Sequence, residues 1–167
     1  KNIGSVVPSS VFLAHAVTRP IDWQNIRSIV ELGAGTGVFT RYIDQLKHPD
    51  CTAVIFEQDS GLACRLRQSY PCLYHHCRAE EVYGVVRQLG LYQVDCILSG
   101  LPFTNFSQSL RDRILDGVLE ALKPGGLFIA FQYSPHMKNQ LSRRFAKVEL
   151  SFVPLNIPPA FVYYCHK

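Results

Sequence analysis

The residues best suited to ligand binding form a glycine-rich run after a short apolar stretch. The run reads Glu31-Leu32-Gly33-Ala34-Gly35-Thr36-Gly37, and its glycines let the backbone turn tightly and let a ligand approach the peptide groups closely. A helix expected to begin at Val38 would add free N–H donors. Glu57, with Gln58 beside it, ends the next apolar stretch, where a carboxylate can bind ribose hydroxyls. The run therefore predicts a cofactor site.

Two features of this run favour S-adenosylmethionine over a nicotinamide dinucleotide, for which a glycine run is also typical. The spacing is G-x-G-x-G, without a third glycine two residues further on. The acidic Glu31 precedes the glycines, and its charge would repel a diphosphate but attract a sulfonium and an ammonium group. We therefore expect a cationic methyl donor here.

A second segment resembles a known family. Leu122-Lys123-Pro124-Gly125-Gly126 is similar to the segment before strand five in class I methyltransferases, and the resemblance spans residues 29–133. It implies that Arg78-Ala79-Glu80 lies against the adenine, with Ala79 and Glu80 at the matching positions. In an alternative interpretation, Glu80 caps a helix and interacts with its dipole.

The motif Ser99-Gly100-Leu101-Pro102-Phe103 follows the fourth expected strand, at the edge where open α/β sheets hold ligands. It resembles the motif of enzymes that methylate exocyclic base amines, in which Asn or Asp precedes Pro-Pro or Ile-Pro and an aromatic residue. Ser99 lacks the planar carbonyl acceptor of those residues. We assign Ser99 and Gly100 to the cofactor site and Leu101, Pro102 and Phe103 to the substrate pocket, with core packing as the alternative for Phe103.

Across nearly its whole length, the chain resembles the bacterial phospholipid N-methyltransferases, which methylate phosphatidylethanolamine stepwise toward phosphatidylcholine. That family is itself similar to the ribosomal RNA adenine dimethyltransferases. The matching segments are Gly4…Pro8-Ser9-Ser10, Phe12-Leu13-Ala14, residues 31–37, residues 99–103, Phe152-Val153-Pro154-Leu155-Asn156 and Pro158-Pro159-Ala160-Phe161-Val162-Tyr163. The resemblance implies an S-adenosylmethionine-dependent enzyme that methylates a lipid amine and works at the inner, cytoplasmic face of a bacterial membrane.

Other functions remain open. An RNA adenine N6-methyltransferase of the ribosomal RNA dimethylase type would have Asn or Asp at position 99 and a C-terminal helical domain. A small-molecule or protein methyltransferase and a non-enzymatic cofactor sensor are further alternatives. In each of the enzymes, the expected reaction is a direct displacement in which the protein mainly orients the reactants. Tyr133 and His136 are candidates to take the proton from the amine, although both are also typical packing residues.

The net charge of +4 is unevenly distributed and points to an anionic partner. Residues 134–167 hold five Lys or Arg against Glu149 alone, whereas residues 1–133 hold twelve basic and twelve acidic residues. A phospholipid or membrane surface is the favoured partner, nucleic acid is less favoured, and a solvated helix face is the alternative. Family members resemble one another in an amphipathic helix upstream of Gly4. Because the chain begins at Lys1, we expect that helix to lie upstream of it. Membrane docking by residues 1–167 alone should then be weaker than docking with the helix present.

The six cysteines indicate a reducing compartment more than a disulfide scaffold. Cys72, His75, His76 and Cys77 are close in sequence and have the side-chain types of a zinc site. If residues 72–77 form a strand, the two sulfurs point to opposite faces, about 16 Å apart. We therefore expect no bound metal.

The elements that position these residues alternate between apolar and amphipathic stretches. The pattern predicts an α/β fold: a single domain over residues 1–167 with a Rossmann-like, doubly wound, mostly parallel seven-stranded sheet and helices on both faces. The expected strands are Ser28–Leu32, 53–57, 72–77, Val94–Ser99, 127–133, Lys147–Val153 and Ala160–His166. The expected helices are an N-terminal cap helix within residues 1–20 that carries Phe12, Leu13, Ala16 and Val17 on one face, then Val38–Leu46, 62–68, 110–122 and 138–144. The last two strands should form an antiparallel hairpin at the sheet edge.

Overall fold

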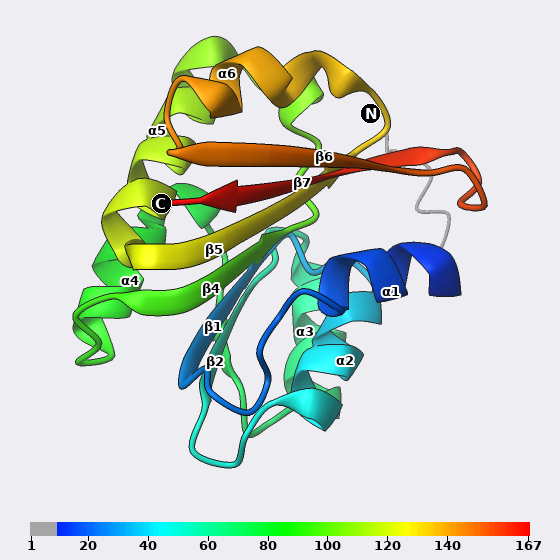
Figure 1. Cartoon of the computed structure of the whole chain (residues 1–167). Coiled ribbons are helices and arrows are strands. Elements are labelled where there is room, and N and C mark those ends of the chain that lie inside the picture. The colour runs from blue at the N-terminus through cyan, green and yellow to red at the C-terminus, as the bar shows by residue number, and fades with distance from the viewer. Residues whose placement is uncertain (1–9) are drawn as a thin grey trace.

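The computed structural model describes residues 10–167 and contains a seven-stranded sheet in the order β3-β2-β1-β4-β5-β7-β6 (Figure 1). The strands are β1 Ser28–Leu32, β2 Thr52–Phe56, β3 Tyr74–His76, β4 Val94–Ser99, β5 Leu122–Gln132, β6 Lys147–Val153 and β7 Ala160–His166. The first five are parallel, and β7 runs antiparallel to both β5 and β6. The expected fold class and the C-terminal hairpin are thus confirmed.

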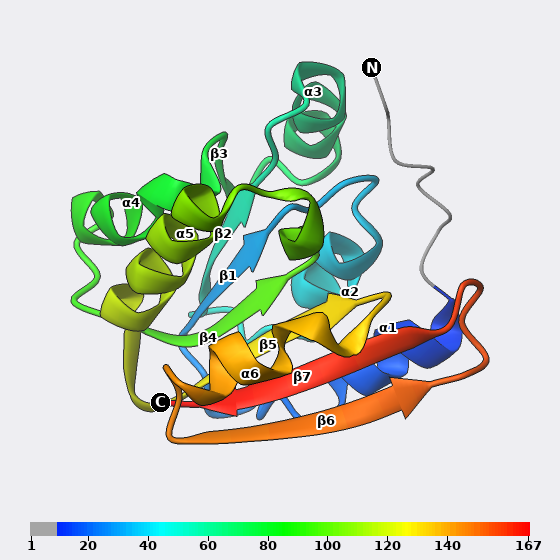
Figure 2. The same ribbon diagram turned by 90° about the horizontal axis from the view of Figure 1, so that it is seen from above.

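Helices cover both faces of the sheet (Figure 2). The α-helices are α1 Val11–Thr18, α2 Val38–Leu46, α3 Ser60–Ser69, α4 Val82–Gln88, α5 Gln108–Ala121 and α6 Lys138–Ser142, and the 3₁₀ turns are η1 Ala79–Glu81, η2 Phe103–Asn105 and η3 Pro135–Met137. One apolar cluster joins α4, α5 and α6 to the sheet, and a second joins α1, α2 and α3 to its other face. No helix in residues 10–167 is long and apolar enough to span a membrane.

The central strands bring the candidate site residues to one edge. All five residues of β1 are buried, as expected for a strand covered by helices on both faces. Leu32 pairs with Phe56 of β2 on one side and with Ser99 of β4 on the other, so the three strands end at the same level. The glycine run, Glu57 and the 99–103 motif therefore emerge at a common carboxyl edge.

The helix α1 begins with a side-chain cap, because Ser10 Oγ accepts a hydrogen bond of 3.2 Å from the backbone N–H of Leu13. Its buried face differs from the expected one: Leu13, Ala14 and Val17 are buried, whereas Phe12 is 54% exposed. The apolar spacing of this helix is ambiguous, since a purely apolar first turn has no polar side to fix its rotation. The Gly4…Pro8-Ser9 part of the motif lies outside the described residues.

Three strands depart from the expected bounds, and β2 does so by one residue, since it spans Thr52–Phe56 instead of 53–57. The strand β3 spans three residues instead of 72–77, because Pro71, which has no N–H to donate, and the turn that follows delay pairing with β2. The strand β5 begins earlier than expected, at Leu122, and the Lys-Pro-Gly-Gly segment forms an irregularity within it. Gly125, with φ +73°, donates to the carbonyl of Lys167 at 2.9 Å, so the C-terminus holds this segment against the sheet.

The helix α4 was not expected from the sequence. Its buried residues Val82, Val85 and Val86 follow the i, i+3, i+4 spacing of a helix face. Seven residues with an internal glycine give a weak signal, and packing against α5 stabilises the helix.

Asp95 joins three strands at the amino edge of the sheet. Its Oδ2 accepts hydrogen bonds from the backbone N–H groups of Arg27 and Ser28 at 2.8 and 2.9 Å and from the Ser28 hydroxyl at 2.9 Å, and its Oδ1 pairs with Lys123. Burial acts to raise the pKa of Asp95, but the bonds from Lys123, Arg27 and Ser28 outweigh it and lower the pKa below its usual value. The ionised form therefore stabilises the native state, and this contribution is lost as pH falls below about 4.

We expect Asp95→Ala to lower the free energy of unfolding by about 3 kcal/mol at pH 7, because two strand amides and an ammonium lose their acceptor. Asp95→Asn, which keeps one acceptor oxygen, should lose less. Denaturant unfolding at pH 7 measures both variants. An unchanged midpoint for Asp95→Ala would contradict the assigned role.

Candidate cofactor and acceptor site

The glycine run forms a loop between β1 and α2 whose backbone only glycine adopts easily. Gly33 and Gly35 have φ values of +76° and +58°. A Cβ at Gly33 would lie 2.7 Å from the Leu101 side chain, whereas one at Gly35 would meet nothing within 4 Å. Gly33 thus permits close packing against the 99–103 motif, and Gly35 leaves open space in which a ligand can reach the loop backbone.

Glu57 holds this loop from the end of β2. Its Oε2 accepts a hydrogen bond of 2.7 Å from Gly35 N–H, and its Oε1 accepts one of 2.8 Å from Asp59 N–H. Each carboxylate oxygen can accept a second bond. The neighbouring Gln58 is exposed. The ribose assignment of Glu57 and Gln58 therefore stays a prediction that this geometry allows.

Glu31 is a buried carboxyl group beside the first turn of α2. It is 0% exposed, its Oε2 accepts a hydrogen bond of 2.7 Å from the Thr40 hydroxyl, and its Oε1 has no hydrogen-bond partner within residues 10–167. Burial, opposed by the hydrogen bond from Thr40 and assisted by the charge of Glu57, raises the pKa of Glu31 from its usual 4.5 to about 7. A buried carboxyl oxygen without a partner suits a cationic ligand and disfavours a diphosphate. These residues therefore fit S-adenosylmethionine.

Two residues that hold this site, Thr40 and Gln132, were not expected from the sequence. Thr40 is fully buried. Its position three residues after Gly37 was the sequence feature that could have indicated a place beside the glycine loop. Gln132 ends β5 at the carboxyl edge and donates through Nε2 to the carbonyl oxygens of Leu101 at 2.7 Å and Phe131 at 2.6 Å. A polar residue at the end of a buried strand was the signal for Gln132, but its partner could not be read from spacing.

The 99–103 motif packs directly against the glycine loop. Ser99 is fully buried, and its hydroxyl accepts a hydrogen bond of 3.3 Å from the Leu101 N–H. A Cβ at Gly100 would lie 2.9 Å from the carbonyl oxygen of Gly33. Any side chain at position 100 would therefore separate the ends of β1 and β4.

The three residues assigned to the substrate pocket differ in exposure. Leu101 is half-buried and Pro102 is exposed at the carboxyl edge. Phe103 is 1% exposed and packs edge-on against Phe106, with ring centroids 6.1 Å apart. The position of Phe103 corresponds to the core-packing alternative. Pocket roles for Leu101 and Pro102 stay predictions.

The expected adenine-side residues follow β3. Ala79 is buried in η1, and Glu80 accepts hydrogen bonds from Arg78 at 2.8 and 3.0 Å.

Cys72 and Cys77 flank β3 as exposed free thiols. In the described part of the chain, no group of three or more His, Cys, Asp or Glu side chains could hold a metal ion.

Tyr133 and His136 lie just beyond β5 at the carboxyl edge. Tyr133 is 50% exposed and lies edge-on to Phe131, and burial of its hydroxyl raises the pKa. The phenol therefore keeps its proton at neutral pH and is a poor base. His136 is exposed, and its Nδ1 lies 2.9 Å from the Ser134 hydroxyl.

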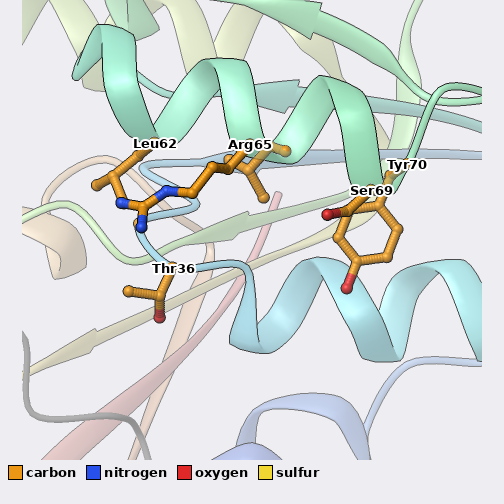
Figure 3. Close-up of a pocket in the computed structure, with 7 residues that line it drawn as sticks. Thr36, Leu62, Arg65, Ser69 and Tyr70 are labelled. Atoms are coloured by element: carbon orange, nitrogen blue, oxygen red, sulfur yellow. The ribbon is translucent and has the colours of Figure 1, made fainter.

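A shallow cavity of about 210 Å³ lies between the glycine loop and α3. It is lined by Gly35, Thr36, Leu62, Arg65, Leu66, Ser69 and Tyr70. Figure 3 shows Leu62 and Arg65 reaching from α3 toward Thr36. Neither Glu31 nor the 99–103 motif lines this cavity, so the cavity flanks the glycine loop on the α3 side only.

Glu57→Ala should weaken S-adenosylmethionine binding by about tenfold or more, because the variant loses both the hydrogen bond that holds the glycine loop at Gly35 and the proposed acceptor for the ribose hydroxyls. Calorimetry measures the affinity, with Glu149→Ala as a control that removes an exposed carboxylate from β6 at the far edge of the sheet. An unchanged affinity would mean that the ribose lies elsewhere.

Glu31→Gln should remove a pH dependence. The native pKa of about 7 exceeds the unfolded value of 4.5, so the protonated form stabilises the cofactor-free protein and that stability is lost as pH rises through 7. A cationic ligand favours the ionised form, so S-adenosylmethionine affinity should rise between pH 6 and 8.

In the Glu31→Gln variant, the cofactor-free unfolding temperature should change less between pH 6 and 8 than in the wild type, and cofactor affinity should be weak at both values. Thermal unfolding and calorimetry at the two pH values test this. A wild-type affinity that falls with pH would rule out the role of Glu31 as a counter-charge.

Comparison with known proteins identifies a close relative. The chain is 36% identical to an ornithine lipid N-methyltransferase from Singulisphaera acidiphila over an alignment of length 171, which covers 98% of this chain and 88% of that protein. No model of a protein family matches the chain.

Solved structures share the fold at low sequence identity. An O-methyltransferase from Bacillus cereus in complex with SAH superposes with a TM-score of 0.72 at 13% identity, covering 95% of this chain and 82% of that one. A precorrin-6y C5,15-methyltransferase from Geobacter metallireducens gives 0.70 at 14% identity, covering 93% and 87%. With the relative, the fold and the cofactor loop in agreement, the chain is a class I S-adenosylmethionine-dependent methyltransferase and belongs to the lipid N-methyltransferase family of the ornithine lipid enzyme.

Proposed function

We propose that the acceptor is the head-group amine of a membrane lipid and that the enzyme works at the inner face of a bacterial membrane. The observation that carries this proposal is the 36% identity to the ornithine lipid N-methyltransferase across 98% of the chain. Ornithine lipid is therefore one candidate acceptor. Phosphatidylethanolamine is the other, supported by the motif resemblance over nearly the whole sequence. Both head groups carry an aliphatic amine.

The bound cofactor supplies an electrophilic methyl group on a cationic sulfur. The carboxylate of Glu31 offsets positive charge, and the glycine loop, braced by Glu57, orients the donor. The Ser99-Gly100-Leu101 turn, which Gln132 holds through the Leu101 carbonyl, forms the adjoining wall. Orientation of the amine at a near-attack distance of about 3–3.5 Å provides the main acceleration, and no protein nucleophile is needed.

The amine must lose its proton before it attacks. Because Tyr133 stays protonated, we assign its hydroxyl oxygen an orienting role as a hydrogen-bond acceptor for the amine. His136 and water remain the candidate proton acceptors. The exposed position of His136 at the carboxyl edge supports proton transfer to solvent.

The position of Ser99 supports a lipid acceptor over a nucleic-acid base. Its buried hydroxyl is engaged by the Leu101 N–H and offers no planar carbonyl to a base amine. The RNA alternative requires that acceptor. A non-enzymatic sensor would bind cofactor without turnover.

Methyl transfer can be tested with radiolabelled S-adenosylmethionine. We expect label to enter vesicles that contain phosphatidylethanolamine or ornithine lipid, and not vesicles of phosphatidylcholine and phosphatidylglycerol, which lack a primary amine. Transfer to ribosomal RNA without transfer to either aminolipid would overturn the proposal. Label in ornithine lipid alone would remove phosphatidylethanolamine as an acceptor, and label in phosphatidylethanolamine alone would remove ornithine lipid.

A further inference from the structure

Five apolar side chains are exposed where α1 begins and where β6 passes into β7. They are Val11 (75% exposed), Phe12 (54%), Phe152 (54%), Leu155 (61%) and Ile157 (79%), and we call them the apolar rim. We propose that the apolar rim is a docking surface for a lipid bilayer, inserted between head groups while the carboxyl edge of the sheet faces the membrane. This inference rests on the proposed lipid acceptor.

A buried asparagine assembles the rim from two distant segments. Asn156 is 2% exposed, its Oδ1 accepts a hydrogen bond of 2.9 Å from the Ser10 N–H, and its Nδ2 donates to the Pro158 carbonyl at 2.7 Å. The polar residue of the loop thus points inward, while its apolar neighbours Leu155 and Ile157 face solvent. Figures 1 and 2 both show the loop beside the first turn of α1. This arrangement reverses the usual preference of a surface loop.

The rim lies at the same edge as the candidate site. Gln132, the last residue of β5, pairs with Phe161, and Val153, the last residue of β6, pairs with Ala160. Both strands therefore end beside the start of β7, at the carboxyl edge from which the glycine loop also emerges. Tyr133 lies at this edge and is itself 50% exposed. A lipid held at the rim would present its head group along this edge toward the loop.

The charges around the rim suit an anionic lipid surface. Residues 10–21, 121–148 and 150–167 contain no Asp or Glu, and among the residues just beyond β5 are His136 and Lys138. Apolar side chains beside basic residues, without carboxylates, are typical of surfaces that bind the interface of anionic membranes. An apolar rim whose own segments hold no carboxylates and few cations is less suited to the phosphate contacts of nucleic-acid binding, which need many Lys and Arg.

The test compares the wild type with Leu155→Ser/Ile157→Ser on vesicles of phosphatidylglycerol and phosphatidylcholine, which contain no acceptor amine. We expect the partition coefficient in co-sedimentation to fall by about tenfold or more, because two exposed apolar side chains no longer enter the bilayer. Tyr92→Ser, which removes a 76% exposed ring ahead of β4 at the opposite edge, should bind like the wild type. Affinity for S-adenosylhomocysteine should be unchanged in both variants.

The outcomes separate this inference from the acceptor assignment. Wild-type vesicle binding that requires Leu155 and Ile157 supports the apolar rim, whether or not a lipid is methylated. A failure to methylate either aminolipid would reject only the proposed acceptor. Equal vesicle binding by the wild type and the double variant overturns the rim, whatever the activity. Loss of a dimer in the double variant during analytical ultracentrifugation, without an effect on vesicle binding, would instead identify a self-association surface and also overturn it.

Discussion

Burying a carboxyl group with one unpartnered oxygen is costly unless the group is neutral or meets a cation, and Glu31 is such a group. The sheet fixes its position, because Glu31 pairs with Ile55 of β2 and Leu98 of β4 in the middle of the parallel strands. The protein therefore holds a negative or protonatable site beside the glycine loop at a cost to its own stability. In the role proposed for Glu31, a cationic donor would offset that cost when it binds, whereas a diphosphate would increase it.

The rest of the site depends on how closely β1 and β4 approach each other. Glycines at positions 33 and 100 remove the side chains that would separate the two strand ends, and Leu101 fills the space beside Gly33. Gln132 then fixes the Leu101 carbonyl from β5. The glycine loop and the turn at residues 99–101 thus pack directly against each other, so a displacement of one would shift the other. Such close packing suits the proposed reaction, which orientation of the reactants accelerates.

The sequence predicted local features well and features set by tertiary contacts less well. The bounds of β1, β4, β6, β7 and α2 agree with the expected ranges, because each combines a clear apolar pattern with a defined turn or cap. The expected start of β5 was wrong, since the strand begins where Leu122 pairs with Val94 of β4, ahead of the irregular Lys-Pro-Gly-Gly segment. In the site, the glycine loop was predicted from local features: the glycine spacing and the acidic residue before it. The contact of Gln132 and the burial of Phe103 arise from neighbouring strands and from Phe106, which no local pattern records.

The chemistry of the acceptor offers a physical reason for serine at position 99. The lone pair of an exocyclic base amine is delocalised into its ring, so a carbonyl acceptor that draws on the N–H groups helps to localise it. An aliphatic amine has a localised lone pair and needs only to lose its extra proton. Such an acceptor does not need a planar carbonyl at position 99 to localise its lone pair. The Ser99 hydroxyl instead stabilises the turn by accepting a hydrogen bond from the Leu101 N–H. The departure from the base-methylating motif is therefore what an aliphatic amine acceptor predicts.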